Sequence, residues 1–333
     1  MTAARLPLPT VLLSAGLLLS VLCLASLLLG AGDVGIGPSL AALFGGGDDD
    51  ARFVVFELRG LRTELAVLVG VALGAGGLLL QAATRNPLAE PGLLGVSAGA
   101  SFAVVVAISL GASAGTLSLA VAVLGAMVGC VLVLLVTQLR GVGDDPVRLV
   151  LAGAAFTGLL TALSSLLLLQ DQRTADEVRF WVIGALAGRS PDTVSWSLPG
   201  LILGLLVVLP LVRPLAALAL GERVASGLGH HPQLTRLATL LAVALLVGTA
   251  TAAAGPIGFV GLVVPFLARR LVGSDVRRGL GVAILLGPCV VLAADILSRL
   301  LVRPYELPVG VVTAFVGAPI LIAVVRSHRL PSL

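Results

Sequence analysis

Charged residues are so widely spaced along this chain that most of the sequence consists of long apolar runs. An α-helix that crosses the roughly 30 Å hydrocarbon core of a membrane needs about 20 residues. Charge-free intervals near or above this length lie between residues 5 and 33, 64 and 85, 90 and 140, 148 and 171, 192 and 213, 236 and 269, 278 and 295, and 306 and 326. This pattern predicts an all-α membrane protein.

Two of these intervals are too long for a single crossing. The interval that follows Glu90 contains a run of small residues at 111–115, and the interval that follows Arg236 contains Gly255 and Pro256. Glycine and proline interrupt helices, so we predict two helices in each interval. The result is ten transmembrane helices in a single transmembrane domain that covers residues 1–333.

An even number of crossings places both chain termini on the same side of the membrane. Loops rich in arginine face the cytoplasm, and most arginines fall on the side of the termini while most acidic residues fall on the other side. The sequence therefore predicts cytoplasmic termini. The first apolar run also resembles a secretory signal peptide, although its length favours a first transmembrane helix.

Composition supports the membrane assignment and excludes other classes. Hydrophobic residues make up 58% of the chain, charged residues only 11%, and the mean hydropathy is +1.13. These values exclude a water-soluble protein. The net charge of +4 is spread over loops without a basic run, which argues against nucleic-acid binding and favours contact with anionic membrane lipid.

Motifs for bond chemistry are absent from the sequence. There is no phosphate-binding GxxxxGK[ST] loop and no HExxH or GxSxG pattern, so we predict that the chain is not an enzyme. An ion- or proton-coupled secondary transporter, the alternative, needs titratable groups at membrane depth. Asp295 is the acidic residue that could lie within a span. Uphill transport would therefore draw its energy from a separate subunit.

One segment after the second predicted helix is rich in turn-forming residues: Asn86, Pro87, Glu90, Pro91 and Gly92. Two prolines and a glycine within six residues end one helix and direct the next. On local physics alone, this segment is an ordinary turn between helices.

At this point the sequence resembles a family, the FecCD-type permeases, which are membrane subunits of ABC importers for iron siderophores, haem and cobalamin. The resemblance is carried by residues 85–99, by 255–265 with Gly255, Pro256 and Pro265, and by 294–299 and 306–319 with Pro308. It implies a type II ABC importer permease that forms half of a homodimeric or heterodimeric channel. It further implies ATPase subunits on the cytoplasmic side, an extracytoplasmic solute-binding protein, and a bacterial cytoplasmic membrane.

The resemblance also assigns a role to three outer arginines: Arg59, Arg62 and Arg299. In the family, matching arginines form ion pairs with glutamates of the binding protein, and such rim charges suit orientation and fast encounter. The family often has proline at the position of Leu61. Without the resemblance, interfacial anchoring by snorkelling arginines would explain these residues.

The loop at residues 214–235 resembles the family's cytoplasmic coupling helix, which contacts the ATPase subunit. Apolar and charged residues alternate there between glycines, which predicts a short helix. The residues concerned are Gly221, Glu222, Arg223, Ala225, Ser226, Gly227, Leu228 and Gly229. An amphipathic surface loop is the alternative.

No metal site or cofactor is predicted. His230 and His231 are adjacent and have no acidic or cysteine partner nearby in sequence, so they do not form a metal site. Many family members have histidine where this chain has Phe266, so a polar role at that position is lost. Iron-siderophore import is the leading function; the exact chelate, or haem or cobalamin instead, is left open.

Overall fold

The computed structural model describes residues 7–32, 34–112, 116–138, 146–170, 175, 178, 181–303 and 305–326. Within these ranges the chain is helical and contains no strand, so the all-α prediction is confirmed. The helices are α1 (Leu8–Leu28), α2 (Ile36–Leu43), α3 (Asp49–Arg52), the π-helix η1 (Phe53–Gly60), α4 (Leu61–Thr84), the 3₁₀ helix η2 (Pro91–Leu94), α5 (Val96–Ser109), α6 (Thr116–Gln138), α7 (Pro146–Gln170), α9 (Asp192–Ala219), α10 (Glu222–Gly227), α11 (Pro232–Ala254), α12 (Val260–Val272), α13 (Val276–Leu300) and α14 (Val309–Arg326).

Each of the ten predicted spans contains a helix. Six helical segments in the described ranges are long and apolar enough to cross a membrane: Leu8–Leu28, Asp49–Thr84, Leu151–Gln170, Asp192–Ala219, Pro232–Ala254 and Val276–Leu300. Val96–Ser109, Ala120–Val133 and Val309–Ile322 are shorter apolar helices, and α12 has 13 residues. The structure therefore supports six clear spans, and the full count of ten stays a prediction.

Both predicted helix breaks are present. α5 ends at Ser109 and α6 begins at Thr116, on either side of the small-residue run, of which 113–115 lie outside the described residues. α11 ends at Ala254, and Gly255 follows with a positive φ of 76°. α12 begins at Val260, and Phe259 just before it also adopts a left-handed φ of 67°.

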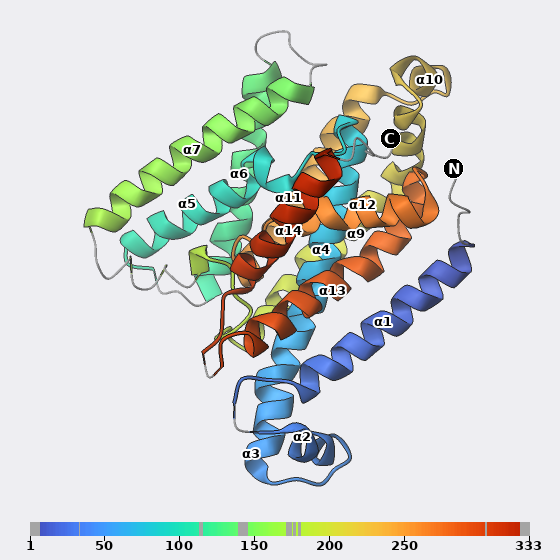
Figure 1. Ribbon diagram of the computed structural model, residues 1–333. Coiled ribbons are helices and arrows are strands. Elements are labelled where there is room, and N and C mark those ends of the chain that lie inside the picture. Colours follow the sequence, from blue (N-terminus) through green and yellow to red (C-terminus); the bar gives the residue numbers. More distant parts are fainter. Residues whose placement is uncertain are drawn as a thin grey trace.

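α4 runs through the middle of the bundle, with α11, α12, α13 and α9 packed around it (Figure 1). Glycines allow this close packing. Gly70 and Gly74 meet α13 at Gly287 and Pro288, and Gly77 meets α12 at Gly261. A side chain at any of these three positions of α4 would overlap the neighbouring backbone. The central helices are thus held at backbone contact.

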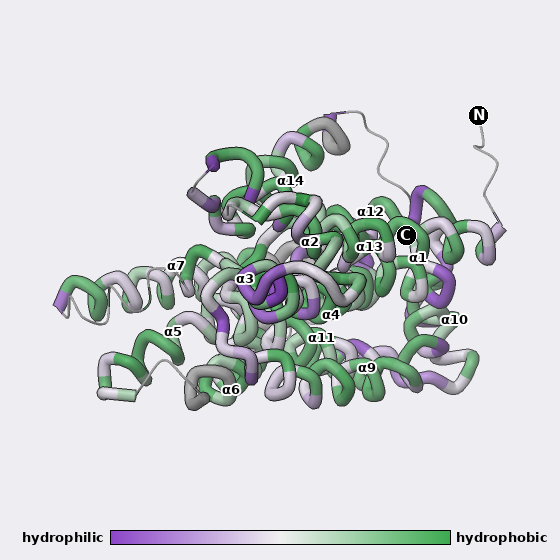
Figure 2. Tube along the Cα trace, turned by 90° about the horizontal axis from the view of Figure 1, so that it is seen from below, coloured by the Kyte–Doolittle hydropathy of each residue, from purple (hydrophilic) through white to green (hydrophobic). Residues whose placement is uncertain are grey.

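The two ends of the bundle differ in what they carry. The start of α1, the end of α14 and the short helix α10 lie toward one end, and α2 and α3 lie at the other (Figure 1). We call these the α10 end and the α2 end. Figure 2, which looks at the molecule from the α2 end, shows hydrophobic positions along the long helices and a strongly hydrophilic segment at α3.

Candidate functional site

The α2 end holds a cluster of buried charges that joins α4, α13 and the segment before α14. Arg62 Nη2 donates to Asp295 Oδ1 at 2.8 Å, and Arg62 Nη1 donates to Glu306 Oε2 at 2.6 Å. Arg299, four residues after Asp295 on α13, pairs with the second oxygen of the same carboxylate. Two cations and two anions thus balance each other at this end, where Arg62 and Glu306 are the members that reach the surface.

Arg299 also holds the end of α1. Its Nη1 donates to the carbonyl oxygens of Ser26 at 2.9 Å and Leu29 at 3.2 Å, and its Nη2 donates to Ser26 Oγ at 2.9 Å. The last four carbonyls of a helix have no partner within the helix, so a cation at this position satisfies them and stabilises the helix dipole. Ser26 Oγ in turn lies 2.8 Å from Thr63 Oγ1.

Arg59 plays a similar part from the π-helix η1. Its Nη1 donates to the carbonyls of Leu27 at 3.1 Å and Leu28 at 3.0 Å and to Ser39 Oγ at 2.9 Å. Its Nη2 donates to the carbonyl of Val34 at 2.9 Å. One side chain therefore fastens the end of α1, the following turn and α2 to η1.

The three predicted docking arginines lie close together but are not equally placed for docking. Arg59 is 4% exposed and Arg299 is 1% exposed, while the Arg62 side chain keeps 12%. Their role in docking stays a prediction, in which Arg62 is the arginine able to meet a partner directly. Sequence reasoning missed the partners. The spacing of Asp295 and Arg299 is that of an ion pair on one helix, but Glu306 and Ser26 carry no local signal.

The predicted coupling segment forms the short helix α10, bounded by Gly221 with φ 116° and Gly229 with φ 80°. Glu222 pairs with Arg236 of α11 at 2.5 Å, which ties the helix to the bundle. Ala225 is buried against the chain itself, whereas Val224 and Leu228 are 44% and 62% exposed. Arg223, Ser226 and Gly227 are also exposed. The apolar side chains that α10 and its C-cap expose are therefore Val224 and Leu228, not Ala225, and their contact with an ATPase subunit stays a prediction.

The turn-rich segment between α4 and α5 is fastened to the break before α12. Asn86 Oδ1 accepts from the backbone N–H of Leu88 at 2.9 Å. Glu90 Oε1 accepts from the N–H of Phe259 at 2.5 Å. Pro91 begins η2, and its ring contacts Gly261. Local turn chemistry thus does more than end a helix, because it places the partly buried Glu90 carboxylate at the start of α12.

The other predicted turn residues also lie at helix junctions. Gly255 approaches the Trp181 carbonyl so closely that no side chain would fit there. The carbonyl of Pro256 lies against Gly184, Pro265 lies inside α12, and Pro308 begins the turn into α14. Gly92 has open space around its Cα.

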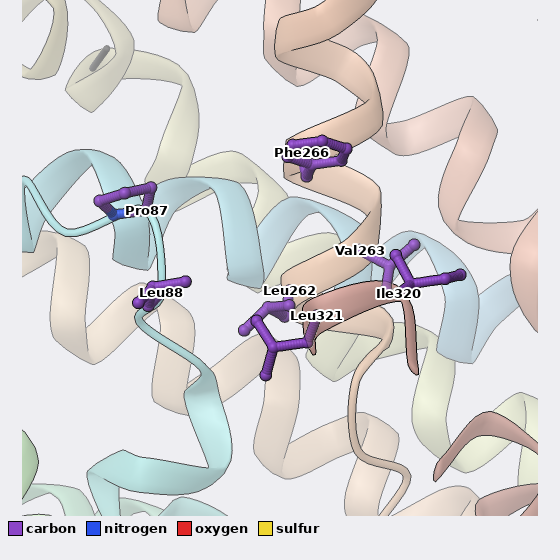
Figure 3. Close-up of a pocket in the computed structure, with 7 residues that line it drawn as sticks. All are labelled: Pro87, Leu88, Leu262, Val263, Phe266, Ile320 and Leu321. Atoms are coloured by element: carbon purple, nitrogen blue, oxygen red, sulfur yellow. The ribbon is translucent and has the colours of Figure 1, made fainter. Parts of the chain in front are cut away.

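A hollow lies between the turn-rich segment, α12 and α14 (Figure 3). Its walls are apolar and are formed by Pro87, Leu88, Leu262, Val263, Phe266, Ile320 and Leu321. Phe266 is the position at which many members of the resembled family carry histidine. A passage that crosses this region would hold a polar cargo weakly. Among the described residues, no three His, Cys, Asp or Glu side chains gather closely enough to bind a metal ion.

Comparison with known proteins finds a matching family model, curated relatives and a similar solved structure. The FecCD transport family matches residues 18–327. The ferric enterobactin transport system permease protein FepD of Escherichia coli (strain K12) is 44% identical over 312 residues, 93% of this chain and 93% of that protein. The Fe(3+)-citrate import system permease protein YfmD of Bacillus subtilis (strain 168) is 34% identical over 304 residues, 91% and 90% of the two chains. A solved inward-facing structure of a transporter assigned to the metal-chelate ABC type has a TM-score of 0.83 at 29% identity, covering 96% of this chain and 99% of that chain.

Proposed function

This chain belongs to the FecCD transport family, and from this premise we propose that it is the membrane-spanning permease subunit of an ATP-driven importer of iron-siderophore chelates. The observation that carries the proposal is the 44% identity to the ferric enterobactin permease along 93% of both chains. A second relative is named for ferric citrate. Haem and cobalamin are the competing cargoes.

The proposed topology has ten crossings with both termini in the cytoplasm of a bacterial cell. Arginines concentrate in the loops on the side of the termini, and α10 lies toward the same end as the start of α1 and the end of α14. The α10 end is then cytoplasmic and the α2 end extracytoplasmic. In this arrangement residues 214–235 form a cytoplasmic loop within one transmembrane domain.

ATP hydrolysis is assigned to a separate subunit that contacts α10. A short helix bounded by two glycines with positive φ, held by the Glu222–Arg236 pair and presenting Val224 and Leu228, offers an apolar surface that a partner can cover. Closure of the ATPase subunits would push on this helix, and α9 and α11 on either side of it would carry the movement into the membrane.

The α2 end would receive the extracytoplasmic binding protein. Arg62 and Glu306 offer partly exposed opposite charges, which suit recognition of a charged partner surface. Arg59 and Arg299 would support docking indirectly, since they hold the end of α1 and the carboxylate of Asp295 around Arg62. The channel itself needs a second permease chain, either a copy of this one or a relative.

A proton- or ion-coupled secondary transporter is the competing function. Such a transporter needs a titratable group that can release its ion at membrane depth. Asp295, the acidic residue considered for this part, is fully buried between Arg62 and Arg299. Both oxygens of its carboxylate are engaged in ion pairs with arginines of the same chain, so the side chain serves as a structural partner and is not free to bind a transported ion.

The test is uptake by the assembled importer in proteoliposomes, with the ATPase subunits and a cognate binding protein present. We expect ATP-dependent accumulation of a radiolabelled ferric catecholate siderophore, and no accumulation with an ATPase variant unable to hydrolyse ATP. If the importer accumulates haemin or cobalamin in preference to every ferric chelate tested, that compound and not a ferric siderophore is the cargo. Accumulation driven by a proton gradient in the absence of ATPase subunits would overturn the importer assignment.

A further inference from the structure

A second hollow lies at the α10 end, where α4, α9 and the turn between α12 and α13 meet. Polar groups in its wall come from Arg85, Arg269, Ser274 and Asp275, and the first turn of α13 contributes Val276 and Gly279. Neither the importer function nor the coupling helix accounts for this group of residues.

Arg269 lies in the last turn of α12 and is 7% exposed. Its Nη2 donates to Gln81 Oε1, but its Nε is buried without a hydrogen-bond partner, and no carboxylate pairs with it within the described residues. A buried guanidinium with unused donors and no counter-charge costs free energy. The side chain is therefore incompletely satisfied by the protein itself.

Arg85 adds a second cation to the same wall. It caps α4 in the left-handed conformation, with φ 48°, and its exposed guanidinium has no hydrogen bond or ion pair to the part of the chain that the structure describes. Arg85 and Arg269, from different helices, thus border one hollow, and neither has an anionic partner among the residues that the structure describes.

The start of α13 contributes a further favourable field. This helix has 25 residues, and the N-terminal end of a helix attracts negative charge. The negative charge of Asp275 would repel an anion, but this charge is partly neutralised by neighbouring groups. Asp275 Oδ1 accepts from the Arg277 N–H at 2.8 Å, and Oδ2 lies 3.7 Å from Arg278 Nε. Because Arg85 and Arg269 outnumber the single carboxylate of Asp275, the wall of the hollow has a net positive charge.

We propose that this hollow binds a phosphate group. Guanidinium groups hydrogen-bond phosphate oxygens with good geometry, the Ser274 hydroxyl can donate, and the dipole of α13 adds attraction. Because the hollow lies where α4 and α12 end, its ligand can be the headgroup phosphate of an anionic phospholipid, as in other basic pockets between transmembrane helices. A soluble phosphate or phosphate ester would satisfy the same donors.

The experiment measures ligand binding to the purified, delipidated full-length chain in mild detergent. Phosphatidylglycerol and inorganic phosphate are titrated separately and binding is followed by native mass spectrometry, with thermal unfolding as a second readout. The variants are Arg85→Gln and Arg269→Gln. Arg270→Gln is the matched control, because Arg270 is exposed on the same helix and does not border the hollow.

We expect Arg85→Gln to weaken phosphatidylglycerol binding about tenfold, the effect of losing one charge-assisted hydrogen bond, while Arg270→Gln binds as the parent chain does. Arg269→Gln should weaken binding at least as much if the variant folds. If it does not fold, the Arg85→Gln variant still decides the test, because Arg85 is exposed and its replacement should not disturb folding. An Arg85-dependent response to inorganic phosphate alone supports the site and identifies a soluble ligand. If Arg85→Gln binds both ligands as the parent chain does, the proposal is overturned.

Discussion

Two groups of arginines at opposite ends of this molecule, Arg59, Arg62 and Arg299 at the α2 end and Arg85 and Arg269 at the α10 end, have different surroundings. At the α2 end, both terminal nitrogens of Arg59, Arg62 and Arg299 donate hydrogen bonds, and Asp295 and Glu306 balance the charges of two of them. At the α10 end, Arg269 has one neutral partner and Arg85 has none among the described residues. Arginine side chains thus hold the fold together at the α2 end, whereas at the α10 end they keep donors available for a ligand.

Burial alone does not separate these cases. Arg299 and Arg269 are both largely buried, and each has an Nε atom without a partner. The difference lies in the terminal nitrogens and in the counter-charge. A buried arginine whose terminal nitrogens and charge are both satisfied by its own chain stabilises the fold. A buried arginine that lacks these partners is a candidate for binding an anionic ligand.

The strongest test of this contrast is Arg299→Gln. Removing one partner of a buried ion pair typically costs about 3–5 kcal/mol, and we expect about 3 kcal/mol here because Arg62 still neutralises Asp295. The end of α1 would also lose its cation. Denaturant or thermal unfolding in detergent measures the loss. Arg303→Gln, on the exposed turn after α13, is the control and should stay within about 0.5 kcal/mol; equal stability of both variants would contradict the framework role.

Glu90→Ala is expected to have the next largest effect. It removes a charge-assisted hydrogen bond to the partly buried N–H of Phe259, which costs about 1–3 kcal/mol. Glu90→Gln keeps an oxygen at the same position and should lose less. The same unfolding measurement distinguishes the two variants. If both lose the same stability, the hydrogen bond to Phe259 is not what Glu90 contributes.

Glu306→Gln should have a small effect on stability, at most about 1 kcal/mol, because the pair that it weakens lies partly in solvent. The ion pair between Arg62 and Asp295 remains in this variant. Since the change removes a competitor for Arg62, capture of an acidic binding-protein surface should become faster at low salt. Surface plasmon resonance at two salt concentrations measures the rate, and a slower capture would argue against Arg62 as the contact.

Leu228→Asp is expected to leave the stability of the chain within about 0.5 kcal/mol, since the side chain is 62% exposed. It should nevertheless weaken assembly with the ATPase subunits about tenfold or more, because an apolar contact becomes a desolvated charge. Co-purification yield and the ratio of transport to ATP hydrolysis report this loss. Leu58→Asp, at a leucine that is 50% exposed at the α2 end, is the control and should assemble normally.

The spacing of charges and small residues predicted the helices well. The end of α11 at Ala254, the break after Ser109 and the short helix α10 all follow from local rules on glycine, proline and helix length. These features depend on residues that are neighbours in sequence, so the sequence pattern is enough to locate them.

Contacts between distant segments could not be predicted in this way. Nothing near Arg59 indicates that its guanidinium meets carbonyls about 30 residues earlier, nor does anything near Glu90 point to Phe259. Such contacts depend on how whole helices pack, and the packing depends on glycines whose role is visible only when both helices are in place. The framework role of Arg59 and Arg299 therefore emerges from the structure alone.

The glycine contacts along α4 have a consequence for movement during transport. Gly77 and Gly261, and likewise Gly70 and Gly287, meet backbone to backbone, so these helices cannot slide past one another without first separating. α4, α12 and α13 must then travel as a single rigid body when the channel changes shape. Bending relative to α5 and α11 would then have to occur in the connecting segments, at the Asn86–Pro91 turn and the Gly255–Phe259 break, which the Glu90–Phe259 hydrogen bond links.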